Sequence, residues 1–167
     1  MKKIYGATER QDGLYKIGRN KWELIYGFGK DSDDAESGFN YRERFDHKPT
    51  HDELKAVIIS QINEQTDANI LSGFEWNGIN VWLSTENQIN FKAAYDLAVQ
   101  TNGTILPVKF KLGEDAEGNP MYFTFTDVDT FTDFYVSAVQ HVTSCISEGW
   151  IEKDSIDWNN YKHVVDP

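Results

Sequence analysis

The sequence contains a single cysteine, Cys145, in 167 residues. An intrachain disulfide and a multi-cysteine metal site are therefore excluded, which fits a reducing compartment. Basic residues are also scarce, since 16 Lys and Arg stand against 27 Asp and Glu, for a net charge of -11. Because binding to phosphates needs clustered Lys and Arg, we expect no nucleic-acid partner.

Long apolar runs are missing as well. No window approaches the run of about 20 apolar residues that a membrane-spanning helix requires. Residues 1–6 include two lysines but no hydrophobic segment of the kind found in secretory signals, and neither end carries a lipidation motif. We therefore expect no membrane partner and no export by that route.

Aromatic residues, in contrast, are abundant: they make up 14% of the chain, within an apolar fraction of 40%. This composition is far from that of disordered chains, and the length is near that of one domain. We expect an α+β fold, with antiparallel β-hairpins, about three packed helices and a small N-terminal β meander. The predicted domains are residues 1–46 for the meander and residues 47–167 for the α+β domain.

The meander is predicted from three β-rich runs separated by turn residues, at 14–17, 22–26 and 39–41. Residues 29–38 have glycine at both ends and charge throughout, which is typical of a solvated loop.

A first helix is predicted over residues 50–66. Thr50 and Glu53 form a capping box at its start. Apolar residues then recur on one stripe of a 3.6-residue period: Leu54, Val57, Ile58 and Ile62. Asp67 and Asn69 are predicted to end this helix.

The dipeptide Asn77–Gly78 predicts a β-hairpin, because both residues tolerate positive φ. The register that places the large apolar residues on one face has three pairs: Trp76 with Ile79, Phe74 with Val81, and Ser72 with Leu83. Trp82 then faces the other way, opposite Gly73, and its ring is expected to cover that glycine.

A second capping box, at residues 85–88, predicts a second helix. Its inner face is predicted from residues that recur every fourth position, with Ala94 at the margin: Ile89, Ala93 and Leu97. Phe91 and Tyr95 form a second apolar pair one turn apart.

Two strands joined by an acidic loop at 113–120 are predicted next, each with its apolar residues on one face: Val108, Phe110 and Leu112, then Met121, Phe123 and Phe125. A last long helix is predicted to begin near Thr130 and to end at Gly149 as a C-terminal cap. Its apolar stripe contains seven residues: Phe131, Phe134, Tyr135, Ala138, Val142, Cys145 and Ile146. The tail is expected to pack back as a short helical turn.

Few side chains in the sequence are candidates for metal binding or catalysis. His141 and Cys145 stand four residues apart, a spacing that lets two side chains share a metal ion or a proton. Because Cys145 also lies on the apolar stripe, a structural role is favoured. Acidic clusters at 31–36 and 114–117 lack the EF-hand pattern and are interpreted as solvated loops.

Catalytic motifs are not found: the sequence has no Gly-x-Ser-x-Gly elbow, zinc-binding His-Glu-x-x-His or dinucleotide fingerprint. We expect no catalytic residues, no cofactor and no metal, and therefore a protein that binds or assembles. The remaining candidates are aromatic rings, which serve as sugar-stacking platforms or interface anchors. Trp22, Trp82 and Trp158 are predicted as partner or glycan contacts from their position alone.

Four motifs in the second part of the chain are distinctive: Phe74-x-Trp76-x-Gly78, Val81-Trp82-Leu83-Ser84, Glu86-Asn87-Gln88 and Glu148-Gly149-Trp150. Together they resemble a phage and prophage tail-associated domain family of unknown function. The resemblance covers roughly the last two thirds of the chain, a domain-sized segment. That family offers no catalytic residues to carry over.

The resemblance implies a non-enzymatic structural or assembly protein of phage or prophage tails. Its partners would be tail or other virion proteins, with a homo-oligomer also expected, and its location the cytoplasm of the bacterial host or the virion. Residues 1–46 would then be a docking module. Two alternatives remain: a carbohydrate-binding module, which the aromatic content favours, and an enzyme of unrecognised type.

Overall fold

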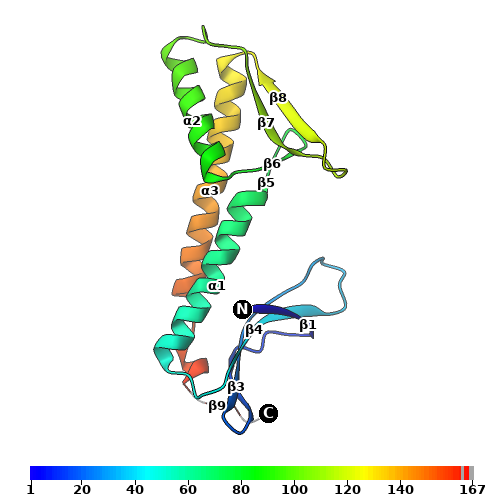
Figure 1. Cartoon of the computed structure of the whole chain (residues 1–167), viewed down its shortest axis with the longest axis vertical. Coiled ribbons are helices and arrows are strands. Elements are labelled where there is room, and N and C mark those ends of the chain that lie inside the picture. Colours follow the sequence, from blue (N-terminus) through cyan, green and yellow to red (C-terminus); the bar gives the residue numbers. More distant parts are fainter. Residues whose placement is uncertain (163, 166–167) are drawn as a thin grey trace. The chain divides into compact units, whose positions relative to one another are not determined.

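The computed structural model describes residues 1–162 and 164–165 and has the predicted α+β class (Figure 1). The chain divides into two compact units, one formed by Met1–Asn63 with Glu152–Pro167 and the other by Glu64–Ile151. The boundary predicted after residue 46 is not where these units divide. The first unit also takes in the start of the first helix and the C-terminal tail, because both pack on the N-terminal sheet.

The first unit contains a five-stranded sheet in the order β1-β4-β3-β2-β9. Its strands are β1 (Lys2–Ala7), β2 (Gly13–Gly18), β3 (Lys21–Gly29), β4 (Gly38–Phe45) and β9 (Val164–Val165). Neighbouring strands are antiparallel except β2 and β9. The three predicted runs lie in β2, β3 and β4. Strand β1 was missed because nearly all of its side chains are exposed, so it has no apolar alternation.

The core of the first unit lies between this sheet, the first turns of α1 (His51–Ser72) and the short 3₁₀ helix η1 (Trp158–Tyr161). The buried side chains are Leu14, Trp22, Leu24, Tyr26, Leu54, Ile58, Ile62 and Tyr161. Residues 158–161 of the tail therefore pack back as a helical turn, as predicted, whereas Trp150, which was expected to belong to this tail, lies in α3 (Val128–Asp154). The Tyr26 hydroxyl donates to Glu152 Oε1 at 2.6 Å; burial and this carboxylate raise the pKa of Tyr26, so the hydroxyl stays a donor.

Helix α1 begins as the sequence predicts and ends later. The Thr50 N–H donates to Glu53 Oε2 at 2.7 Å and the Glu53 N–H to Thr50 Oγ1 at 3.3 Å, so the capping box is confirmed. The predicted end is wrong: Asp67 and Asn69 are exposed residues inside a helix that reaches Ser72. Polar side chains that face solvent cost a helix little, so they do not stop it.

The Asn77–Gly78 turn forms as predicted, with φ of 50° and 73°. It joins β5 (Phe74–Trp76) to β6 (Ile79–Val81). Both apolar pairs nearest the turn are confirmed: Trp76 with Ile79 and Phe74 with Val81. The pair Ser72 with Leu83 is wrong, because Ser72 still belongs to α1; the Leu83 N–H donates instead to the Leu71 carbonyl at 3.0 Å.

The rest of the second unit is built from α2 (Thr85–Gln100), β7 (Val108–Glu114), β8 (Pro120–Phe125) and α3 (Val128–Asp154), which continues into the first unit. Figure 1 shows α2 beside the first half of α3, with the β7–β8 hairpin next to them. The core is rich in aromatic rings; for example, Phe125 and Phe131 stack with centroids 4.4 Å apart. Both faces predicted for the hairpin point into this core.

The predicted inner face of α2 is wrong. Ile89 and Leu97 are 61% and 51% exposed, whereas Phe91 and Ala98 are buried. The reason is the ring of Phe91, whose centroid lies 5.0 Å from that of Phe134 in α3. The packing of this ring against Phe110 and Phe134, and not the regular apolar stripe, sets the rotation of the helix. The N-cap is Ser84, one residue before the predicted capping box.

Helix α3 carries the predicted stripe but is longer at both ends. It begins at Val128, where Asp127 Oδ1 accepts the Thr130 N–H at 2.7 Å. Gly149 is not a C-terminal cap, because the helix continues through it to Asp154. Gly149 instead faces Thr66 of α1, whose Oγ1 would lie 2.5 Å from an added Cβ. In the described part of the chain, no helix has the length and apolar character to cross a membrane.

Candidate functional site

Trp82 is an exposed aromatic residue that lines a pocket of the second unit. Its neighbours Val81 and Leu83 are buried, at 0% and 1% exposure, whereas Trp82 is 51% exposed. Successive side chains of extended backbone point to opposite faces, so burial of these neighbours turns the indole outward. The Trp82 N–H donates to the Leu112 carbonyl at 2.8 Å, and the Trp82 carbonyl accepts from Asn87 Nδ2 at 2.8 Å. The backbone below the ring is therefore held from both sides.

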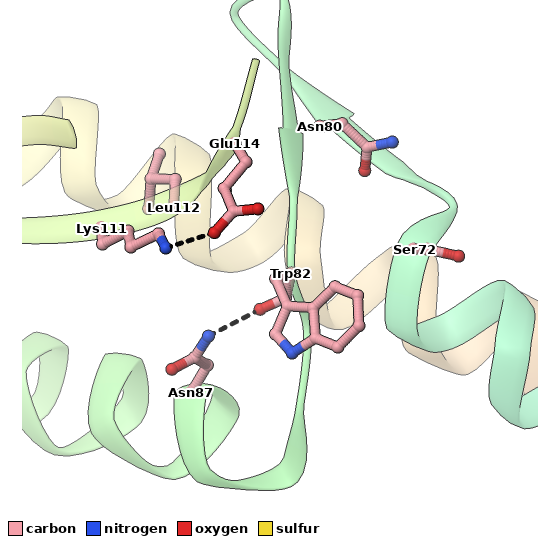
Figure 2. Close-up of a pocket in the computed structure, with 8 residues that line it drawn as sticks. Ser72, Asn80, Trp82, Asn87, Lys111, Leu112 and Glu114 are labelled. Carbon is pink, nitrogen blue, oxygen red and sulfur yellow. Dashed lines mark hydrogen bonds and ion pairs between the residues drawn. The ribbon is translucent and has the colours of Figure 1, made fainter. Parts of the chain in front are cut away.

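The space around this ring, the Trp82 pocket, has a volume of about 540 Å³. Its lining residues are Ser72, Asn80, Trp82, Asn87, Lys111, Leu112, Gly113 and Glu114. Figure 2 shows the indole projecting from the segment after β6 on the side of Ser72 and Asn80, with Asn87 at the start of α2. Four separate elements thus supply the wall, which no single stretch of sequence reveals.

Gly113 lets β6 approach β7 at the base of this pocket. A Cβ at Gly113 would overlap the carbonyl oxygen of Asn80, so a larger residue would separate the strands. The β7–β8 pairing also shifts register between Lys111 and Gly113, a local irregularity of the kind that redirects side chains. The glycine therefore fixes where the β7 side chains stand relative to Trp82.

Polar groups of the pocket supply both donors and acceptors. Lys111 Nζ and Glu114 Oε1 form an exposed ion pair at 2.6 Å. The Asn80 side chain makes no hydrogen bond to the described part of the chain, and Asn87 uses only its amide nitrogen on Trp82. The charged groups cancel, so the pocket is polar but neutral.

The three tryptophans predicted as contacts are not brought together. Trp22 and Trp158 belong to the first unit and Trp82 to the second. Trp22 is only 8% exposed and lies in the first core, so it does not offer a surface. Trp158 is half-buried, with its ring 5.4 Å from that of His51 and 5.9 Å from Lys55 Nζ.

Sequence reasoning missed a more exposed ring. Trp150 is 62% exposed and the adjacent Ile151 is 66% exposed, near the end of α3. A helical period of 3.6 residues could have found Trp150, because it falls opposite the buried stripe of Phe134, Ala138 and Cys145.

A second surface of this unit is apolar. The α2–α3 groove has a volume of about 320 Å³ and is lined by Leu83, Thr85, Gln88, Ile89, Phe91, Lys92, Tyr135, Ala138, Val139, Val142 and Thr143. Ile89 and Val139, at its edges, are 61% and 45% exposed. Lys92, the one charged residue among the lining residues of the described chain, pairs with Asp96 Oδ2 at 2.6 Å.

His141 and Cys145 do meet, but as structural groups. His141 Nε2 lies 3.0 Å from the Asn69 carbonyl and 3.5 Å from Cys145 Sγ. A carbonyl only accepts, so we assign the ring hydrogen to Nε2. Burial, and then the charge of Glu148, raise the pKa of the Cys145 thiol, whereas a reactive cysteine needs a lowered pKa. The geometry therefore agrees with a core role for this cysteine.

One carboxylate in each acidic loop is held by other groups of the chain. Asp31 pairs with Lys3 at 2.7 Å, and Asp115 Oδ1 accepts the N–H groups of Glu117 and Asn119. Asn119 Nδ2 also donates to Asp115 Oδ2 at 3.0 Å, and this bond, followed by the one from the Asn119 backbone N–H, lowers the pKa of Asp115. Within residues 1–162 and 164–165, no three His, Cys, Asp or Glu side chains are grouped to hold a metal ion.

Fold and site together define an α+β protein of two compact units, with an open pocket beside an exposed tryptophan in the second. The chain belongs to the family described as Domain of unknown function (DUF4376), which matches residues 53–166. The match includes every residue that lines the Trp82 pocket and the α2–α3 groove. No curated protein and no solved structure matches the chain significantly.

Proposed function

We propose that the chain is a non-enzymatic assembly protein of phage or prophage tails, and that it binds a second copy of itself through the α2–α3 groove. The observation that carries the proposal is the exposure of Ile89 and Val139 on either side of an apolar groove. Removing such side chains from water is favourable in proportion to the apolar area covered. The groove is therefore a surface that gains stability when another chain covers it.

The charge of the chain restricts where a second copy can bind. Two molecules that each carry a charge of -11 repel one another over most of their surface. They can meet only where the facing surfaces are neutral. The α2–α3 groove meets this condition, because the charge of Lys92 is balanced within the same helix by Asp96. A strongly basic partner would instead be expected at an acidic face.

The phage or prophage setting is supported by the motifs around Trp76, Trp82 and Trp150, which resemble tail-associated proteins. Within that setting the chain would also contact tail or other virion proteins.

The solution mass tests the proposal directly. Light scattering at several protein concentrations is expected to give a closed dimer for the wild-type chain. Ile89→Lys places a charge at the covered face and is expected to weaken the dimer by at least about tenfold, equivalent to about 1.4 kcal/mol. Asn90→Lys makes the same charge change at the next exposed position of α2 and is expected to leave the mass unchanged.

A wild-type chain that stays monomeric at every concentration would overturn the self-association. If Ile89→Lys and Asn90→Lys both remain dimeric, the dimer interface lies outside the α2–α3 groove. The proposed role in phage or prophage tails is tested separately. The test is quantitative mass spectrometry of purified particles and assembly intermediates from the phage that encodes the chain. Its absence from both would contradict a role in tails.

A further inference from the structure

We propose that the Trp82 pocket binds a neutral saccharide, whose sugar ring stacks on the indole of Trp82 while its hydroxyl groups bond to the polar wall. This site is distinct from the α2–α3 groove, and no residue lines both. The inference therefore goes beyond self-association and adds a ligand of another chemical class.

The first argument is the platform. A sugar ring has an apolar face of C–H groups, which packs on a flat aromatic ring that is open to solvent. Trp82 is such a ring, because it is 51% exposed and lines the pocket. The backbone N–H of Trp82 donates to the Leu112 carbonyl, and the backbone carbonyl of Trp82 accepts from Asn87 Nδ2. These two bonds hold the backbone under the ring in place. Because this backbone is already fixed, a ligand need not order it on binding.

The second argument is the chemistry of the wall. Hydroxyl groups both donate and accept, so a sugar needs donors and acceptors side by side. The side-chain amide of Asn80 offers both, the Asn87 Oδ1 accepts, and the Lys111–Glu114 pair supplies a charged donor and a charged acceptor. Hydrogen bonds to charged groups are stronger than those between neutral groups.

The third argument concerns charge and size. Lys111 is neutralised by Glu114 at 2.6 Å, which leaves no unpaired cation in the pocket for a phosphate or a carboxylate. The volume of about 540 Å³ lies inside the range of roughly 300–1,000 Å³ typical of small-molecule sites. An uncharged mono- or disaccharide fits both conditions.

The test follows the indole N–H signals of the five tryptophans by NMR, with the Trp82 signal assigned from its loss in Trp82→Phe. Glucose, galactose, mannose, N-acetylglucosamine and their β-1,4-linked disaccharides are titrated to roughly 50 mM, above the millimolar affinity expected of a small ligand on an open site. At least one sugar is expected to shift the Trp82 signal saturably.

Two variants and a matched control complete the experiment, with affinity measured by saturation-transfer NMR on the sugar. Trp82→Ala is expected to weaken binding by at least about tenfold, and Asn80→Ala by about threefold, within the range of one lost hydrogen bond. Trp150→Ala removes another exposed indole, one outside the pocket, and is expected to leave the affinity within about twofold. Circular dichroism checks that all three remain folded.

Three results would overturn the saccharide site: no sugar in the set shifts the Trp82 signal, Trp82→Ala binds as tightly as wild type, or Trp150→Ala removes binding equally. If a proline-rich peptide shifts the Trp82 signal and no sugar does, the pocket is a peptide site and the saccharide proposal is wrong. Failure here is distinguishable from failure of self-association, because Ile89→Lys is expected to keep sugar binding and Trp82→Ala to keep the solution mass.

Discussion

The indole Nε1–H of Trp76 donates a hydrogen bond to Asp133 Oδ2 across 2.9 Å. Trp76 is 6% exposed, and its ring lies edge-on to Phe134 and Phe123, with centroids 5.1 and 4.8 Å away. Asp133, by contrast, stands on the exposed side of α3. An exposed carboxylate thus satisfies the one polar atom of a buried ring and joins the Asn77–Gly78 hairpin to α3.

Asp133→Ala is therefore expected to lower the free energy of unfolding by about 1–2 kcal/mol, because it leaves a buried indole N–H without an acceptor. Asp133→Asn keeps an acceptor oxygen and is expected to cost less. Urea denaturation measures both. Glu148→Ala, which removes an exposed acid elsewhere on α3, should stay within about 0.5 kcal/mol of wild type. Equal effects of the two alanine variants would show that the hydrogen bond is unimportant.

Gly149→Ala tests the close approach of α3 to α1. Alanine in a helix is favoured over glycine by about 1 kcal/mol, so helix propensity alone predicts a more stable protein. The added Cβ would, however, lie 2.5 Å from Thr66 Oγ1, and overpacking costs about 1–3 kcal/mol. We expect a lower melting temperature in thermal unfolding.

The matched control for this contact is the same change in a Thr66→Ala background. Removal of Oγ1 opens the space beside residue 149, so Gly149→Ala should then be neutral or stabilising. The coupling in this double-mutant cycle should exceed about 0.5 kcal/mol. Additive effects would mean that Thr66 is not what makes glycine necessary.

His47 is expected to make stability depend on pH near neutrality. Its Nδ1 lies 3.1 Å from Asp46 Oδ1 and its Nε2 lies 3.0 Å from Glu53 Oε1. Asp46 first, and then Glu53, raise the pKa of His47 above its ordinary value of 6.5. A raised pKa gives stability that is fully present below 6.5 and is lost as the pH rises through the folded-state pKa.

The melting temperature of wild type should accordingly exceed that of His47→Gln at acidic pH, and the difference should vanish well above the raised pKa. An NMR titration of the His47 ring reports that pKa directly. Glu53→Gln keeps an acceptor oxygen in the capping box but removes one charge, so it should lower the His47 pKa toward 6.5. A wild-type ring that titrates at or below 6.5 would contradict the ion pairs.

Local signals in the sequence located several elements correctly. The capping box of Thr50 with Glu53 and the Asn77–Gly78 turn formed where expected. Both depend on residues close in sequence, whose hydrogen bonds or φ preferences act without help from the rest of the chain. Predictions about helix ends were poorer: α1 passes Asp67 and α3 passes Gly149, because contacts with other elements sustain both helices.

The rotation of α2 shows the limit of periodicity. Two apolar stripes compete on that helix, and the one headed by Ile89 is regular in sequence yet exposed. The stripe that contains Phe91 is the buried one, because the Phe91 ring packs against Phe110 and Phe134, with centroids 5.1 and 5.0 Å away. These two rings belong to β7 and α3, which only the folded chain brings near α2. The same choice leaves Ile89 outside, which creates the α2–α3 groove.

By itself the sequence determined the α+β class, the Asn77–Gly78 hairpin, the apolar stripe of α3 and the net acidic charge, since each follows from local preference, periodicity or composition. The tertiary structure decided which apolar faces are covered and which candidate tryptophan is open. Trp22 and Trp82 have the same chemistry, but Trp22 lies in the first core and Trp82 projects on the side of Ser72 and Asn80. Burial depends on partners distant in sequence, so the Trp82 pocket exists only after four separate elements have folded together.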